Sequence, residues 1–271
     1  MKKLCTTVTI LALAFAPLRA DVTITQTITM EGAMAAQMGG AKPTIVMKIK
    51  GNKVRSDADI MGNTVSSIMD LETRELIVLN TAAKTAQVTS GAAPADKPAT
   101  PAPDVKVEFK AAGTKRTIEG ESCEDHTFKY SMDMTQFSQG QMPPEAAEMM
   151  KGITIIADGV TCIAREGKGV AEYSAFQKAA VQKGMLAVAM GMSPVGGAGG
   201  GLEKLMAAMA SAPGLPYITE ISLSFEGTSP MVDMMKQMGG IKMTQKTTAV
   251  STDPLPDDLF KVPADFKVEK K

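Results

Sequence analysis

The sequence predicts a mainly β protein, with an antiparallel sheet and several short helices. Two observations lead to this prediction. Over many short segments rich in β-branched residues, apolar and polar residues alternate, as they do in strands with one buried face. Between residues 170 and 209 the apolar residues instead recur every three to four positions, as they do on one face of a helix.

Residues 1–20 have the pattern of a secretory signal peptide. A basic start at Lys2 precedes an apolar run over residues 4–16, which is shorter than the ~20 residues that a membrane-spanning helix needs. Ala20 supplies a small residue for cleavage. We therefore expect one mature domain over residues 21–271 and a periplasmic location, with secretion beyond the periplasm as an alternative.

The mature N-terminus has the clearest alternation in the chain. Val22, Ile24, Ile28 and Met30 fall on one face and threonines on the other, which predicts a half-buried antiparallel strand. Similar segments follow, and short turns with glycine join the first ones into an up-and-down meander. Further strands are expected over residues 44–51, 54–60, 65–71, 75–80, 85–90, 105–111, 114–120, 123–134, 152–159, 160–166, 216–227 and 241–250.

Two segments interrupt the strand pattern. Residues 90–104 contain four prolines and five alanines, and because proline removes a ladder donor we expect a flexible loop there. Asp158 and Gly159 lie between two apolar segments, which predicts a hairpin turn.

Helical spacing appears in three places. A helix is expected over residues 170–192, with Tyr173, Phe176 and Ala180 on its buried stripe, and the glycine run at 196–201 should separate it from a second helix over 202–209. A third helix is expected over 229–239, capped by Ser229. Apolar residues near the C-terminus are expected to pack into the core: Leu259, Phe260, Val262 and Phe266.

Two cysteines remain after processing, Cys123 and Cys162. An even number in an exported protein predicts a structural disulfide; a redox or metal site is the alternative, although no CxxC spacing is present. His126, the single histidine, lies three residues after Cys123, so the two should face opposite sides of a strand. We interpret it as a surface residue beside the disulfide.

Methionine is unusually abundant, with 22 residues, whereas tryptophan is absent. Segments 30–42 and 225–242 share a pattern in which a strand ends in Glu-Gly and a Met-bearing stretch closes on Gln-Met-Gly-Gly. Such inserts must lie at one end of the sheet. Their thioethers could present an adaptable apolar surface or simply fill the core. The candidate ligand-binding residues are Met231, Met234, Met235, Met238, Phe176, Met185, Met34 and Met38.

Composition and motifs argue against several functions. The chain carries 29 basic and 29 acidic residues, which leaves no electrostatic footprint for nucleic acid. No GxSxG elbow occurs, and no acidic pair of glycosidase type is evident. We expect no enzymatic activity, no cofactor and no metal. The alternative is Cu(I) binding by soft thioethers, including Met132 and Met134.

Three segments resemble the LolA-like group of periplasmic lipoprotein carriers and an uncharacterised exported family similar to it. They are TIVMKIKGNKVRSD followed by MDLETRELIVLNTAAKTA, the cysteine stretch IEGESCEDHTFKY, and the ending LPDDLFKVPADFKV. The resemblance implies a curved antiparallel half-barrel with helices packed on its concave side or at one end. It also implies a carrier for a lipid or a lipoprotein acyl chain. A third hypothesis is a structural envelope protein without ligand.

Overall fold

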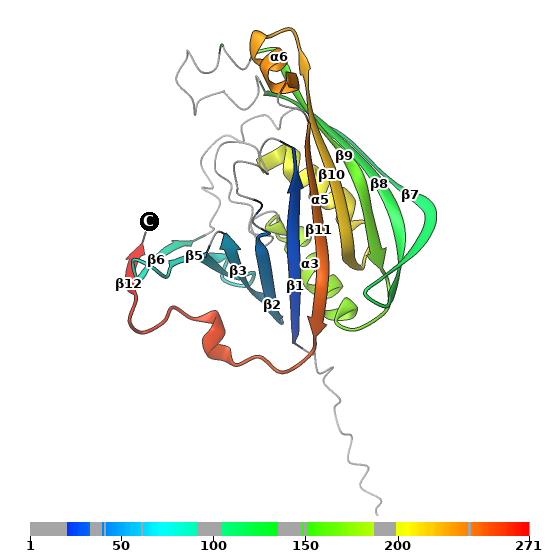
Figure 1. The fold of residues 1–271 in the computed structure, drawn as a ribbon. Helices are drawn as coiled ribbons and strands as arrows, with labels where there is room; N and C mark the ends of the chain where they lie inside the picture. Colours follow the sequence, from blue (N-terminus) through cyan, green and yellow to red (C-terminus); the bar gives the residue numbers. More distant parts are fainter. Residues whose placement is uncertain are drawn as a thin grey trace, which may run out of the picture.

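The computed structural model describes residues 21–32, 40, 42–60, 62–90, 105–134, 148, 151–186, 199–237 and 240–270. These residues form one sheet and three helices (Figure 1). The strands are β1 (Val22–Glu31), β2 (Thr44–Lys50), β3 (Lys53–Ile60), β4 (Asn63–Asp70), β5 (Glu75–Asn80), β6 (Thr85–Ser90), β7 (Val105–Ile118), β8 (Glu121–Asp133), β9 (Ile153–Ala164), β10 (Leu215–Gly227), β11 (Ile241–Ser251) and β12 (Lys267–Lys270). The helices are α3 (Val170–Gln182), α5 (Gly199–Ala210) and α6 (Pro230–Gln237).

The sheet has twelve strands in the order β12-β6-β5-β4-β3-β2-β1-β11-β10-β9-β8-β7. The predicted meander is confirmed, because β1 to β6 pair in sequence order and antiparallel. The central junction is nonlocal: β1 also pairs with β11, which comes more than 200 residues later. β12 adds to β6 in parallel. β7 and β12 are the two edges, so the sheet is not closed into a barrel.

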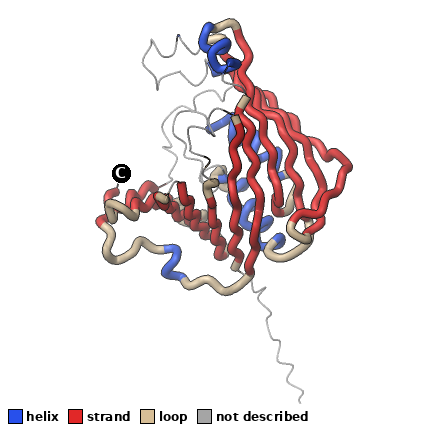
Figure 2. The backbone as a smooth tube through the Cα atoms, in the orientation of Figure 1, coloured by secondary structure: helices blue, strands red, loops and turns tan. Residues whose placement is uncertain are grey.

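The sheet bends around α3. Met69 on β4 and Cys123 on β8 belong to the same core cluster as Tyr173 and Phe176 of α3. This cluster runs from β4 to β8, across seven strand-to-strand steps. Figure 2 shows the helices gathered beside the bent sheet, with one further helix at its end.

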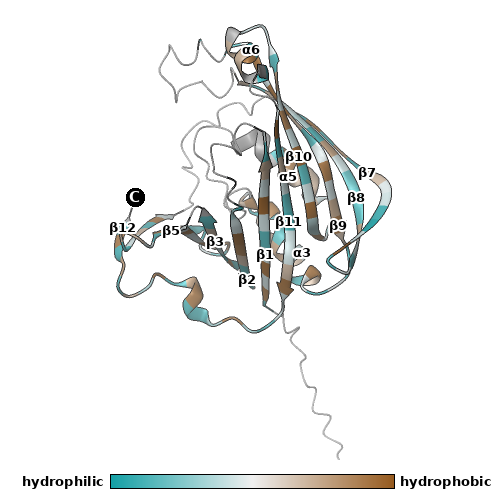
Figure 3. Ribbon diagram, viewed as in Figure 1, coloured by the Kyte–Doolittle hydropathy of each residue, from teal (hydrophilic) through white to brown (hydrophobic). Residues whose placement is uncertain are grey.

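A second helix covers the inner face beside α3. Leu205 of α5 packs with Phe128, Tyr130 and Met132 of β8, and α5 also contacts α3. Figure 3 shows the alternation of hydrophobic and hydrophilic residues along the strands that the sequence predicts. We call the face that carries α3 and α5 the inner face. No helix among the described residues is long and apolar enough to cross a membrane.

The C-terminal segment lies across the other face of the first meander. As expected from the sequence, Phe260 is buried with Ile68 and Leu79, and Leu259, Val262 and Phe266 pack against them. Polar contacts hold the same segment: Lys50 pairs with Asp257, and Arg55 donates to the Leu259 carbonyl. Around Ile68 and Met69 both faces of β4 are therefore covered, because Met69 points toward α3 and Ile68 toward this segment.

Asp57 organises the polar part of this contact. Lys48, Arg55 and Ser66 all donate to its carboxylate. Burial alone would raise the pKa of Asp57, but the three donors together outweigh it and hold this pKa below the ordinary value. Stability from this carboxylate is then fully present above the unfolded-state pKa near 4 and is lost as the pH falls through the lower folded-state value.

We expect Asp57→Asn to lose about 1–2 kcal/mol of unfolding free energy at neutral pH, because charge-assisted hydrogen bonds are lost. The loss should shrink as the pH falls below about 4, where the wild-type carboxylate also becomes protonated. Urea unfolding at several pH values measures both effects. Asp158→Asn, at an exposed carboxylate on β9, is the control. An equal loss at every pH would contradict the electrostatic explanation.

One predicted turn is wrong. Residues on both sides of Asp158-Gly159 belong to the single strand β9, which pairs with β8 and β10 along its whole length. The glycine serves close packing, because a Cβ at Gly159 would lie 2.0 Å from the Glu220 carbonyl oxygen and 2.8 Å from Cζ of Phe128. Two strands were expected over residues 105–111 and 114–120, but Val105–Ile118 form the single strand β7, irregular between Ala111 and Lys115.

The first predicted helix is too long. α3 ends at Gln182, and Gly184 follows with φ of 64°. The Met185 N–H donates to the Ala180 carbonyl and the Gly184 N–H donates to the Val181 carbonyl, which is a Schellman ending. Residues 187–192 of the expected helix lie outside the described residues. α5 begins at Gly199, so the last three glycines of the run are helical, and residues 196–198 lie outside the described residues.

Candidate functional site

Three connections leave the sheet at the same end. The ends of β1, β8 and β10 pair with the starts of β11 and β9, as in Glu31–Lys242, Asp133–Thr154 and Gly227–Ile153. The connecting segments 32–43, 134–152 and 228–240 contain ten of the 22 methionines. We call this end the mouth end. The expectation that the Met-bearing inserts start from one end of the sheet is thus confirmed by the strand register.

Near the mouth end, the inner face of the sheet is apolar but only half-buried. Strand pairing places Met30 opposite Met243, Ile241 opposite Leu223, and Phe225 opposite Ile155. Each pair shares one face, which continues to Met132 and the cluster under α5. The half-buried residues that define this open inner face are Met30, Ile155, Phe225, Ile241 and Met243.

The opposite arm of the bent sheet is also apolar and more exposed. Val65 on β4 is 49% exposed and Val78 on β5 is 38% exposed. Both lie on the inner face, because Val65 shares its side of β4 with Met69, and Val78 shares its side of β5 with Leu76, which packs against the α3 cluster. They line a groove of about 550 Å³ at the ends of β4 and β5. Apolar side chains of the inner face are therefore half-buried on one arm of the sheet and exposed on the other.

A second groove lies between α3 and α5, on the side away from the sheet core. Its volume is about 560 Å³, and its lining is mostly apolar and small, with Lys178 as the only charged residue. The two helices meet there near their C-terminal ends, where Gln182 and Ser211 flank the groove.

Of the residues expected to form the ligand site, those that the structure describes are not brought together. Phe176 is 2% exposed and Met185 8% exposed, and both belong to the packed cluster around α3. The third predicted helix is confirmed as α6, where the Ser229 hydroxyl accepts from the Met231 N–H, but α6 lies at the mouth end. It buries Val232 fully, whereas Met231 is half-buried and Met234 is 55% exposed. Met235 lies in α6, and Met34, Met38 and Met238 lie outside the described residues.

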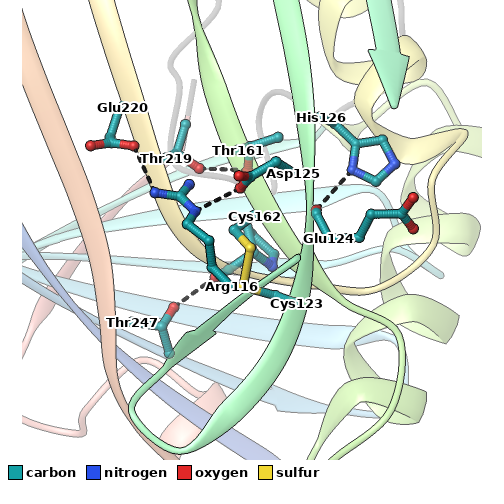
Figure 4. The surroundings of a disulfide bond; sticks show 11 residues. Arg116, Cys123, Glu124, Asp125, His126, Thr161, Cys162, Thr219, Glu220 and Thr247 are labelled. Atoms are coloured by element: carbon teal, nitrogen blue, oxygen red, sulfur yellow. Dashed lines mark hydrogen bonds and ion pairs between the residues drawn. A yellow bond between two sulfur atoms is a disulfide. The ribbon is translucent and has the colours of Figure 1, made fainter. Parts of the chain in front are cut away.

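The predicted disulfide is confirmed. Cys123 and Cys162 are bonded across the neighbouring strands β8 and β9, with a Cα–Cα distance of 5.3 Å, and both are buried (Figure 4). Beside the bond, Arg116 donates to Asp125 at 2.7 Å and to Glu220 at 3.1 Å, which ties β7 to β8 and β10. Neither sulfur is free to hold a metal or attack a substrate.

His126 is buried, which corrects its interpretation as a surface residue. Its ring stacks on Phe109 with centroids 5.2 Å apart, and Nδ1 lies 3.0 Å from the Glu124 carbonyl oxygen. As expected, it points away from the disulfide (Figure 4). Within the described ranges, no group of three or more His, Cys, Asp and Glu side chains could hold a metal ion.

The Met132 thioether, a candidate copper ligand, lies in the core. The Tyr130 hydroxyl donates to its sulfur at 3.0 Å, and burial raises the pKa of Tyr130. The same environment that keeps this phenol neutral also keeps the sulfur away from solvent. Met132 therefore fills the cluster beneath α5, whereas Met30 and Met243 are the thioethers that the register places on the open inner face.

Neither a protein-family model nor a curated protein matches this chain. Among solved structures, the chain is similar to an uncharacterised conserved protein from Thermus thermophilus. The identity is 8% and the TM-score 0.39, over 94% of this chain and 92% of that chain. A likeness of this size carries no argument about fold or function. The resemblance to the LolA-like group stays a prediction.

Proposed function

We propose that this protein is a non-enzymatic binding or carrier protein for an apolar ligand, such as a lipid acyl chain. The observation that carries the proposal is the change in burial along the inner face. Around α3 the inner face is fully buried, whereas toward the mouth end its apolar side chains stay half-buried on one arm and exposed on the other. A ligand that covers this surface gains roughly 25 cal/mol for each Å² of apolar area it removes from water.

Three further features support this proposal. A bent, open sheet with helices on its inner side is compatible with the half-barrel that the sequence resemblance implies. The unbranched, polarisable thioethers of Met30 and Met243 suit ligands of variable shape. The disulfide fits an oxidising compartment outside the cytoplasm, in agreement with the expected signal peptide. We therefore propose that the protein acts in the periplasm.

Native mass spectrometry after mild purification tests the proposal directly. We expect a lipid-sized mass adduct that disappears after extraction with organic solvent, and the extracted protein should then enhance the fluorescence of an apolar dye. A clean apo mass together with no dye response would contradict the proposal. The protein would then be a structural envelope protein with no ligand.

Phe225→Asp should weaken dye and lipid binding by about tenfold or more, because a carboxylate on the open inner face has no partner under a bound apolar chain. Ser224→Asp is the matched control: it adds the same charge at the neighbouring exposed position of β10, on the other face. Dye titration of both folded variants measures the difference. Equal affinities would place the ligand elsewhere, with the groove between α3 and α5 as the next site to test.

A further inference from the structure

The inner face changes from buried to half-buried at a row of polar residues. Along β1, Ile24 is 1% exposed and Gln26 6% exposed, whereas Ile28 and Met30 are half-buried. The same step occurs on β11, where Thr247 is 1% exposed and the next inner-face residue, Gln245, is half-buried. Gln26 lies opposite Thr247, and one step nearer the mouth end Gln245 lies level with Thr219 and Thr161. We call these polar residues the floor of the open inner face.

The hydrogen bonds that link Gln245, Gln26 and Thr247 run in one direction, which a backbone carbonyl fixes. The Pro216 carbonyl can only accept, so the Thr247 hydroxyl must donate to it, at 2.8 Å. The Thr247 oxygen then accepts from Nε2 of Gln26 at 3.2 Å, and this orients the Gln26 amide. Its Oε1 consequently faces Gln245 and accepts from Nε2 of Gln245 at 2.7 Å. The orientation of both amides follows from one carbonyl group.

Gln245 stands at the open end of this chain of bonds. Its Oε1 and its second N–H have no partner among the residues that the structure describes, and the side chain lies between Thr247 and Met243 on the inner face. Each donor in such a chain polarises the next group, so the free amide is a stronger site than an isolated one. It offers one acceptor and one donor at the base of an apolar surface.

No charged residue shares this surface. The inner-face positions of β1, β8, β9, β10 and β11 above the floor carry no Asp, Glu, Lys or Arg in the described strands. An ionised headgroup placed there would lose its hydration without gaining a counter-charge, which is strongly unfavourable. A hydroxyl, which donates and accepts at once, matches the free amide of Gln245.

We propose that the ligand is an uncharged lipid that bears a hydroxyl group and enters with that group first, so that Gln245 binds the hydroxyl while the chain lies along Met30, Met243 and Ile241. This inference rests on the apolar-ligand function proposed above and names the chemical class of the ligand. It also sets the direction of insertion, with the polar group at the floor and the chain toward the mouth end.

Competition against a bound apolar dye tests the inference with three probes of equal chain length: 1-dodecanol, ionised dodecanoate and dodecane. The purified wild-type protein should bind dodecanol about tenfold more tightly than either other probe, as expected for one well-placed hydrogen-bonding group. Gln245→Met keeps the side-chain length but removes the amide, and should bring dodecanol to parity with dodecane. Lys242→Met, at an exposed position on the other face of β11, should keep the preference.

The outcomes separate the two proposals. If no probe or dye binds, the apolar site itself is wrong and the inference falls with it. If all three probes bind alike, the hydroxyl-bearing ligand class is overturned while the apolar site stands. If Gln245→Met keeps the dodecanol preference, the assignment of the hydroxyl to Gln245 is overturned. The wild-type comparison alone decides the ligand class, so the inference stays open to refutation even if Gln245→Met fails to fold.

Discussion

Gly159→Ala is expected to destabilise the protein by about 3–5 kcal/mol, although alanine and other side chains are normally tolerated better than glycine within a strand. The added Cβ would lie 2.0 Å from the Glu220 carbonyl oxygen and 3.0 Å from its carbonyl carbon. Both atoms are backbone, so β9 and β10 must separate or bend to relieve the contact. The ring of Phe128, whose Cζ would be 2.8 Å away, blocks a shift to the other side.

Urea unfolding of Gly159→Ala beside Asp158→Ala measures this effect. Asp158 is the adjacent residue of β9 and is exposed, so its substitution should stay within about 0.5 kcal/mol of wild type. If Gly159→Ala unfolds at the wild-type midpoint, β9 and β10 do not approach as closely as described here. The pairing from Leu215 to Gly227 would then need revision.

Strand positions were predictable because they depend on a local pattern. Val22 and Ile24 alternate with threonines, and β-branched residues with period two form strands in almost any context. The failure at Gly159 has a tertiary cause. Asp-Gly is a hairpin signal when nothing else contacts it, but here the missing Cβ admits a neighbouring strand that lies about 60 residues later in the chain.

The candidate site was less predictable, because it depends on the order of the strands. Met30, Met243 and Phe225 each belong to a strand that the sequence identified. They share one surface only because β1 pairs with β11 and β11 with β10, and no local pattern encodes those pairings. Helical spacing instead predicted Phe176 and Met185 as ligand-binding residues, but both fill the core around α3. A periodic apolar face indicates burial, but it does not distinguish a packed interior from a surface left open for a ligand.

Loss of the Cys123–Cys162 bond is the second large effect expected. The two cysteines are 39 residues apart, and in the chain-entropy model closing such a loop stabilises the folded state by about 4 kcal/mol. Both side chains lie within the cluster around α3, so serine would bury unpaired hydroxyls there and confuse the comparison. Replacing both residues by alanine removes the link with less disturbance of the core.

We therefore expect the Cys123→Ala, Cys162→Ala double variant and the reduced wild-type protein to lose similar amounts of unfolding free energy, about 2–4 kcal/mol each. The denaturant m-value should rise in both, because an unlinked unfolded chain exposes more surface. Agreement between the two would assign the loss to the crosslink, since reduction leaves the volume of the sulfur atoms in place. If the double variant is destabilised but the reduced protein is not, packing of the sulfur atoms is what matters. The bond would then be open to a redox role, the alternative that the sequence also allows.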